Sequence, residues 1–483
     1  MNGRMHLYIV GYVLKIEALF MIPAGAISLY LKEYRSVIGF SLAIALMLII
    51  GIPLTVKPPR NKVIYAKGGL RLAAISWLAL SFFGAIPFFV SGAIPSFLDS
   101  IFESVSGFTT TGASILKDVE HLPRGILFWR SFTHWIGGMG VLVFILSIVS
   151  LSGGHSLNIM RAEAPGPTTD KLVPRVKKTA KILYGIYIVM TILEIILLCL
   201  GGMPLFDSVV HSFGTAGTGG FSIKNASIAA YDSAYIDYVI GIFMVLFGVN
   251  FNAYYLILIR KYRDFFRCEE LKVYLGIIGA AVFFITVNIY KVVYPSLADA
   301  LRHAFFQVSS IITTTGYATA DFDLWPQFSR VILLGLMICG ASAGSTGGGV
   351  KVSRVIIAYK AARRELRRML HPRAVELVRL EGKPVEEETI TMVNAFLIIY
   401  AAVFALSVLF VSLDRLDFDT TFSSVAACLN NIGPGLKAVG PTQNYSGMSS
   451  LSKVVLTLDM LIGRLEIFPI MMLFIPTAWR KEQ

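Results

Sequence analysis

Long apolar runs alternate with short polar segments along the whole chain. The runs at 7–30 and 36–56 are each long enough to cross, as a helix, the roughly 30 Å hydrocarbon core of a bilayer. No small-residue cleavage site follows the first run, so we interpret it as a retained span and not as a signal peptide. The pattern therefore predicts an all-α membrane protein whose residues 1–56 form two N-terminal transmembrane helices.

One pattern then recurs four times: an apolar span, a short segment with a polar end, and a second apolar span. The paired spans are predicted at 71–95 with 126–152, 181–202 with 235–259, 272–295 with 328–358, and 391–413 with 453–476. Chance rarely repeats a whole arrangement of this kind. We therefore predict four repeat units, at 71–155, 175–262, 270–370 and 388–480, around a central pore.

The short segments share their polar ends. They contain the stretches FTTTGAS, GTAGTGGFS, ITTTGYAT and NNIGPGL, which we align on Gly112, Gly219, Gly316 and Gly433. The residues before each stretch predict a helix of two or three turns, which is too short to cross a bilayer. These segments could be ordinary polar breaks between helices, but their matched register in four units favours re-entrant segments.

Re-entrant backbone at membrane depth must be buried in protein or line a water-filled cavity. Four such segments can surround one axis and present backbone carbonyls that replace the hydration shell of a monovalent cation. Glycine suits this backbone because it reaches dihedral angles that other residues avoid. The C-terminal ends of the short helices, which carry partial negative charge, would favour a cation on that axis.

Composition agrees with a membrane protein. Hydrophobic residues make up 55% of the chain and charged residues only 15%, whereas a soluble domain carries about 25% charged residues. The formal net charge of +13 is concentrated in loops that begin near Lys57, Pro174, Arg260 and Lys360. By the positive-inside rule these loops are cytoplasmic, and both termini are then cytoplasmic too. Topology explains the charge, so a nucleic-acid partner is not predicted.

The sequence offers no sign of an enzyme or of a bound cofactor. The four cysteines form no CxxC pair, and no metal-ligand cluster, phosphate-binding loop or group of catalytic side chains stands out. A membrane enzyme is therefore the less favoured class. Coupling to Na⁺ or H⁺ would need intramembrane acids that face the pore, and the candidates are Glu17 and Glu194.

At this point the chain resembles the Trk/Ktr/HKT superfamily of potassium transporters, and most closely the TrkH-type membrane subunits of bacterial Trk systems. The resemblance covers essentially the whole chain and rests on SGFTTTGAS, RSFTHWIGGMGV, GTAGTGGFS, ITTTGYAT, GASAGSTGGGVKV, NNIGPGL and DMLIGRLEIFP. It implies K⁺ uptake across the bacterial cytoplasmic (inner) membrane, with K⁺ as the transported ion. It also implies a homodimer and a cytosolic nucleotide-binding, TrkA-like regulatory ring.

The resemblance further implies a K⁺-selective filter with one glycine from each unit. The predicted filter residues are Thr110, Thr111, Gly112, Thr218, Gly219, Thr314, Thr315, Gly316, Asn431, Ile432 and Gly433, and their backbone carbonyls are the ion ligands. Units two and four depart from the TTTG pattern of units one and three. A Na⁺-coupled or poorly selective Na⁺/K⁺ transporter, including symport, is therefore the alternative.

Two further features concern gating. The stretch from Gly340 to Val352 carries too many glycines for a normal helix, since each costs roughly 1 kcal/mol relative to alanine. We predict a flexible intramembrane gating loop below the filter, although a small-residue packing face is the alternative. Its residues are Gly340, Gly344, Ser345, Thr346, Gly347, Gly348 and Gly349.

Arg464 lies within the last predicted span, where a charge is expensive. A local pair with Glu466 or Asp459, or snorkelling to the interface, would be the simpler explanation. The resemblance implies a pore barrier at Arg464, next to the gating loop. Structural roles are expected for Arg130 and His134. For Glu17, Glu194, Asn250 and Asn252 we expect hydrogen bonds between helices and assign no function.

Overall fold

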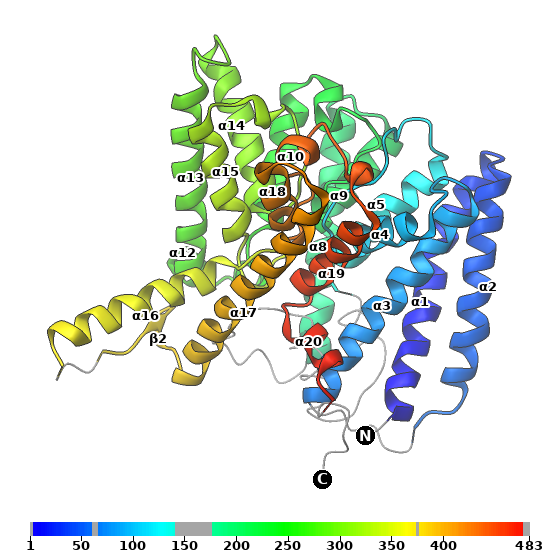
Figure 1. Cartoon of the computed structure of the whole chain (residues 1–483), viewed down its shortest axis with the longest axis horizontal. Helices are drawn as coiled ribbons and strands as arrows, with labels where there is room; N and C mark the ends of the chain where they lie inside the picture. Colours follow the sequence, from blue (N-terminus) through cyan, green and yellow to red (C-terminus); the bar gives the residue numbers. More distant parts are fainter. Residues whose placement is uncertain (1–2, 60–65, 141–175, 373–375, 477–483) are drawn as a thin grey trace.

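The computed structural model describes residues 3–59, 66–140, 176–372 and 376–476, and its ordered elements are almost all helices (Figure 1). Six of the described helices are long and apolar enough to cross a membrane, and a bent pair would make a seventh. The part of the predicted span 126–152 beyond residue 140 lies outside the described residues.

The helices follow the predicted order of long and short apolar segments. The N-terminal pair is α1 (Gly3–Tyr30) and α2 (Tyr34–Val56), which pack against each other at one side of the molecule (Figure 1). Predicted unit one contains α3 (Ala66–Val90), α4 (Phe97–Phe108) and α5 (Arg124–Gly138). Predicted unit two contains α8 (Val176–Leu200), α9 (Leu205–Gly217), α10 (Ala234–Phe247) and α11 (Phe251–Leu258).

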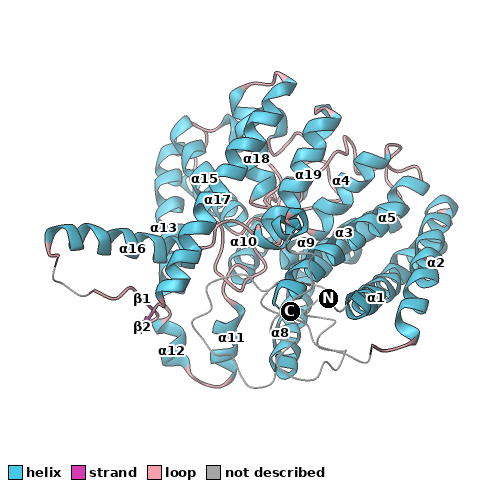
Figure 2. Cartoon of the chain, turned by 60° about the horizontal axis from the view of Figure 1, so that its bottom comes forward, coloured by secondary structure: helices cyan, strands magenta, loops and turns pink. Residues whose placement is uncertain are grey.

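The second half of the chain continues this order. After the short α12 (Tyr262–Arg267) come α13 (Glu269–Ile289), α14 (Leu297–Ile312), α15 (Gln327–Cys339) and α16 (Val352–Leu370). A two-stranded hairpin of β1 (Arg379–Leu380) and β2 (Lys383–Pro384) precedes α17 (Glu387–Val411), α18 (Phe418–Leu429), α19 (Ser450–Arg464) and α20 (Phe468–Phe474). Helix α16 projects from the body of the molecule beside the hairpin (Figure 2).

Two spans predicted as continuous are broken in the structure. The span 235–259 bends by 89° between α10 and α11. The side chain of Asn250 caps α11 there, accepting a hydrogen bond from the Asn252 amide at 2.9 Å. The span 453–476 breaks between α19 and α20, where Glu466 and Ile467 adopt positive φ values of 56° and 64°. The four short helices, α4, α9, α14 and α18, are also longer than the predicted two or three turns, at 12 to 16 residues.

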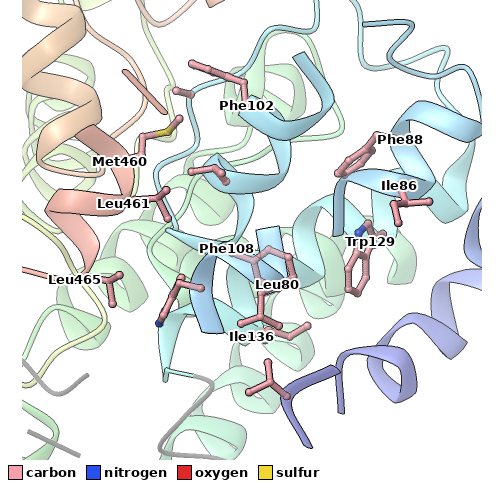
Figure 3. Close-up of a cluster of buried hydrophobic side chains, with 14 of the residues drawn as sticks. Leu80, Ile86, Phe88, Phe102, Phe108, Trp129, Ile136, Met460, Leu461 and Leu465 are labelled. Carbon is pink, nitrogen blue, oxygen red and sulfur yellow. The ribbon is translucent and has the colours of Figure 1, made fainter. Parts of the chain in front are cut away.

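Apolar packing surrounds the end of α4. The Phe108 ring meets the Trp129 ring edge to face with centroids 5.9 Å apart, and the Trp129 indole N–H donates to the Gly84 carbonyl at 3.1 Å. Figure 3 shows both side chains within a cluster that also takes in Leu80 and Ile136. Leu461 of α19 and Leu465, which directly follows this helix, join the same cluster. The short helix is therefore held by helices from both ends of the chain.

We predict that Gly463→Ala destabilises the protein. Helix α19 packs so closely against the end of α18 that an added methyl group would overlap the Leu429 carbonyl oxygen. Overpacking of this kind costs about 1–3 kcal/mol, so thermal unfolding of the detergent-solubilised chain should begin at a lower temperature.

Gly279→Ala is the matched control, since Gly279 lies on an exposed face of α13 with no atom within 4 Å of the new methyl group. Alanine is the better helix former, so this variant should be unchanged or slightly more stable. Equal stability of the two variants would show that α19 can move away without cost.

Candidate functional site

All four short helices end in the same tight turn. One residue at the end of each helix is left-handed, with φ of 55° at Thr110, 55° at Thr218, 58° at Thr314 and 57° at Asn431. In the first turn the Thr110 amide donates to the Gly107 carbonyl, and the Thr111 amide donates to the Ser106 carbonyl. The equivalent bonds of all four turns measure 2.8 to 3.2 Å. This is a Schellman motif, which satisfies the last carbonyls of a helix.

The left-handed residue of this motif is usually glycine, whereas here it is threonine or asparagine. A non-glycine residue with positive φ is uncommon and strained. Packing compensates for the strain at this position of the four turns, because all four residues are fully buried. The sequence pattern Thr/Asn-x-Gly therefore marks a turn that the surrounding protein imposes.

A glycine with positive φ follows two residues after each of these turns. The φ values are 78° at Gly112, 75° at Gly220, 86° at Gly316 and 96° at Gly433. This corrects the predicted register of unit two by one residue. Gly219 has the place of Thr111, Thr315 and Ile432, whereas Gly220 is the equivalent of the other three glycines. Sequence reasoning missed Gly220 because either member of a Gly-Gly pair could be aligned.

These four glycines, which we call the glycine ring, touch one another in a closed cycle. A Cβ atom at Gly112 would overlap the carbonyl oxygen of Gly219, and one at Gly220 would overlap that of Thr315. A Cβ atom at Gly316 would overlap the carbonyl oxygen of Ile432. One at Gly433 would lie 2.7 Å from that of Thr111, which closes the cycle. Each glycine is therefore required by the carbonyl of the next segment as well as by its own φ.

Hydroxyl groups brace two of the four turns in the same way. Thr109 and Thr111 share a hydrogen bond of 2.8 Å between their Oγ1 atoms, and Thr313 and Thr315 share one of 2.9 Å. The fourth turn uses an amide instead. Asn431 Nδ2 donates to Thr111 Oγ1 and to the Met460 carbonyl, each at 2.9 Å. Asn431 thereby ties the fourth segment to the first.

The second turn is braced by His134 on α5. Its Nδ1 lies 2.8 Å from the Gly107 carbonyl, so it is the protonated nitrogen, and its Nε2 accepts from the Phe221 amide at 3.2 Å. A Cβ atom at Gly219 would overlap the His134 ring. His134 is thus a neutral side chain that links the first two segments through hydrogen bonds, which agrees with the structural role expected for it.

Arg130 forms a buried ion pair that the sequence did not reveal. Its Nε donates to Glu103 Oε1 at 2.6 Å, and the Glu103 side chain is fully buried on α4. Glu103 also accepts from Ser114 Oγ at 2.9 Å and from the Ile115 amide at 3.0 Å. These bonds fix the chain just beyond Gly112. The one sign of this pair in the sequence was Glu103 itself, an acidic residue among the apolar residues of a short helix.

The loops that follow the first two segments carry an exposed carboxylate. Asn225 Nδ2 donates to Asp118 Oδ1 at 2.9 Å, and His121 also bonds Asp118. These hydrogen bonds, that from Asn225 foremost, hold the pKa of Asp118 below its ordinary value. Asp118 therefore remains negative and attractive to cations across the neutral pH range.

The glycine-rich stretch forms a loop between α15 and α16 at the predicted position, and its role as a gate stays a prediction. Its Gly348 amide donates to Thr314 Oγ1 at 2.7 Å, so this loop touches the third turn directly. A Cβ atom at Gly348 would overlap the Asn430 carbonyl, and one at Gly347 would lie 2.9 Å from the Thr313 carbonyl. The loop thus lies against the third and fourth segments.

The break between α10 and α11 anchors the other side of this loop. The Gly248 carbonyl accepts from the Ser342 amide at 3.1 Å, and the Phe251 amide donates to the Gly344 carbonyl at 3.0 Å. Glu270 at the start of α13 accepts from the Ala343 amide at 2.7 Å. The unpaired backbone of the bent span therefore finds its partners in the glycine-rich loop.

Arg464 joins three parts of the site. Its guanidinium donates to the Thr346 carbonyl of the glycine-rich loop at 2.7 Å and to the Gly137 and Gly138 carbonyls of α5 at 2.5 and 3.0 Å. It also reaches Thr110 Oγ1 at 3.3 Å.

The acids considered as local partners of Arg464 bond elsewhere. Glu466 pairs with Arg354 on α16, and Asp459 accepts from Ser407 Oγ at 2.7 Å. Neither the Arg354–Glu466 pair nor the burial of Lys351, whose Nζ donates to the Gly347 carbonyl, could be foreseen from the sequence. Basic side chains are therefore concentrated around the glycine-rich loop.

Among the remaining intramembrane polar residues, Asn250 meets the expectation of a bond between helices, since its Nδ2 donates to Glu270 at 3.4 Å. For Glu17 the expectation is wrong, because its carboxylate is buried and accepts no hydrogen bond from the residues that the structure describes. The described residues also contain no group of three or more His, Cys, Asp or Glu side chains that could hold a metal ion.

The chain is similar to known transport proteins over almost its whole length. Residues 39–272 and 269–481 match the family TrkH, described as cation transport protein. The chain is 38% identical over 420 residues to the Trk system potassium uptake protein TrkH of Salmonella typhimurium, with 86% of each chain covered. It is 35% identical over 487 residues to the protein of that name from Halomonas elongata, with 100% of each covered. The crystal structure of the potassium transporter TrkH from Vibrio parahaemolyticus superimposes with a TM-score of 0.89 at 32% identity, covering 99% of this chain and 100% of that one.

Proposed function

This chain belongs to the TrkH family of cation transport proteins, and we propose that it takes up K⁺ across the membrane through the glycine ring. The observation that carries the proposal is the closed cycle of contacts among four segments, each of which ends a short helix and brings backbone carbonyls to the same place. The family is one of transporters and not of enzymes, and K⁺ is the transported ion.

Carbonyl oxygens held by a rigid backbone suit a weakly hydrated monovalent cation. The four Schellman turns satisfy the carbonyls of the helix ends, so the carbonyls between each turn and its glycine are left for the ion. These ligands come from residues 110–112, 218–220, 314–316 and 431–432, since the Gly433 carbonyl accepts a hydrogen bond from Tyr445. The four helix C-termini add a favourable electrostatic field. Relatives named for potassium uptake support K⁺ over the Na⁺-coupled alternative.

The glycine-rich loop is the proposed gate, with Arg464 as its electrostatic barrier. The loop contacts the third and fourth segments from one side, and Arg464 bonds it from another. A fixed positive charge at this depth repels K⁺ strongly, because the surroundings screen it poorly. Movement of the loop would remove the obstruction beside the glycine ring. It would also displace the Thr346 carbonyl, which accepts a hydrogen bond from Arg464.

We also propose that α16 transmits force from a cytosolic partner to this gate. The helix is continuous from Val352 to Leu370 and begins directly after the glycine-rich loop. It projects from the body of the molecule (Figure 1) and carries basic side chains. A homodimer beneath which a nucleotide-binding ring docks on α16, in an inner membrane with both termini cytoplasmic, is the arrangement we favour.

We predict that Gly220→Ser and Gly316→Ser each lower the preference for K⁺ over Na⁺ by about ten-fold or more, which corresponds to at least about 1.4 kcal/mol. Each side chain would strike the carbonyl oxygen of the next segment. Isotope uptake into proteoliposomes under matched K⁺ and Na⁺ gradients measures the preference.

Gly92→Ser is the matched control for these variants. Gly92 also has positive φ, at 76°, but no atom lies within 4 Å of a new Cβ. Gly92→Ser places a side chain at a similar positive φ but outside the glycine ring, so this variant should keep wild-type selectivity. Unchanged selectivity in both ring variants would remove the filter from the proposal.

We predict that Arg464→Gln raises K⁺ uptake several-fold, because it removes the positive charge while retaining hydrogen-bond donors. Arg464→Lys keeps the charge and should stay near the wild-type rate. Initial rates at fixed gradient and protein density would be compared. Slower uptake by the glutamine variant would contradict the role of Arg464 as a barrier.

The partner proposal is tested best at Arg363. On α16, Arg364 pairs with Glu387 at 2.5 Å, Arg367 with Glu376 at 2.6 Å and Arg368 with Glu365 at 3.3 Å. Reversing those charges would disturb the chain itself. Arg363 is exposed and forms no ion pair within the described residues, so its charge is available to a partner.

We therefore predict that Arg363→Glu weakens co-purification with the nucleotide-binding ring by about ten-fold at physiological salt. Arg263→Glu, an exposed change on α12, is the control for a loss of basic charge elsewhere. Full retention of the ring by Arg363→Glu would show that α16 is not its docking site.

A further inference from the structure

One carbonyl of the glycine ring already has a protein partner. The hydroxyl of Tyr445 donates a hydrogen bond to the Gly433 carbonyl at 2.7 Å. The Tyr445 side chain is buried at 2% exposure, and its backbone amide donates to the Ser114 carbonyl at 2.8 Å. The phenol is therefore fixed between the first and fourth segments.

The other three ring glycines differ in this respect. Within the described residues, no donor reaches the carbonyl oxygen of Gly112, Gly220 or Gly316. Tyr317 offers the nearest parallel in another unit. Its hydroxyl donates to the His211 carbonyl at 3.0 Å and lies 3.3 Å from that of Phe221, neither of which belongs to the ring. The bond from Tyr445 thus makes the fourth unit unlike the rest.

The position of Tyr445 indicates where the Gly433 carbonyl points. The phenol lies in an apolar cluster with Phe102 of α4 and with Val425 and Cys428 of α18. Its ring is 5.7 Å from that of Phe102. A hydrated cation has no place in this cluster, so a carbonyl directed at the phenol is directed away from the ion path.

We infer that Tyr445 is a positioning residue that sets ion selectivity by holding the Gly433 carbonyl away from the ion. The inference rests on the proposed K⁺ uptake through the glycine ring. Selectivity depends on the number and field strength of the carbonyls around the ion. With one of four glycine carbonyls engaged by a phenol, the ring coordinates K⁺ less completely and discriminates less against Na⁺.

The test is Tyr445→Phe, which removes only the hydroxyl. A buried carbonyl left without its donor is costly and can regain a partner by turning towards the ion. The ratio of K⁺ to Na⁺ uptake in proteoliposomes should therefore rise about five-fold, the equivalent of one ordinary hydrogen bond. A ratio that stays the same or falls would overturn the inference.

A matched variant and a second substitution complete the experiment. Tyr317→Phe removes a buried phenol hydroxyl that does not bond the ring, and its ratio should stay at the wild-type value. Incorporation of 3,5-difluorotyrosine at position 445 keeps the packing and strengthens the donor, so the ratio should fall. If Tyr445→Phe does not fold, the 3,5-difluorotyrosine substitution tests the inference by itself. An unchanged ratio of K⁺ to Na⁺ uptake would then refute the inference.

Failure of the inference and failure of the proposed function give different results. Wild-type uptake of K⁺ and a loss of selectivity in Gly316→Ser would support the function, whatever Tyr445→Phe does. A wild-type chain that takes up no K⁺ would remove both the function and the selectivity that Tyr445 is inferred to set.

Discussion

The whole arrangement depends on ending four helices inside a membrane without leaving their backbone groups unpaired. In hydrocarbon each unsatisfied group costs several kcal/mol. The Schellman turns at Thr110, Thr218, Thr314 and Asn431 meet this requirement for the helix ends and reverse the chain within a few residues. Because the turns are internally satisfied, the carbonyls that follow them are available for the K⁺ coordination that we propose. The cost of this arrangement is backbone strain at four left-handed residues that are not glycine. Tight packing around these residues keeps them in the strained conformation.

Much of this could be predicted from the sequence, because the properties involved are local. Apolar runs of membrane length, repeated polar ends with glycine, and a glycine-rich interruption are all visible within short windows. The helix order and the loop at 340–351 follow from them. The arginine at 464 was recognisable for the same reason, since a charge among apolar residues stands out locally.

The rest depends on contacts between distant residues. Gly219 and Gly220 are equivalent as isolated residues, and only the neighbouring Thr315 carbonyl distinguishes them. The span 235–259 looks continuous because the partners that stabilise its bend, Ser342 and Gly344, lie almost one hundred residues away. The Glu103–Arg130 pair joins two helices in the same manner. Apolar composition predicts where a helix is stable, but it does not reveal where tertiary hydrogen bonds favour a break.

The closed cycle of the glycine ring has a consequence for how such a protein can evolve. In an assembly of four identical chains, one codon change alters all four positions at once. Here each position is encoded separately, so a single change alters one quarter of the ring and the two contacts beside it. Under the proposed role of the ring, ion selectivity can therefore be adjusted in small inherited steps. Compensating changes should arise between adjacent segments, such as those that hold Gly220 and Thr315, more often than between opposite ones.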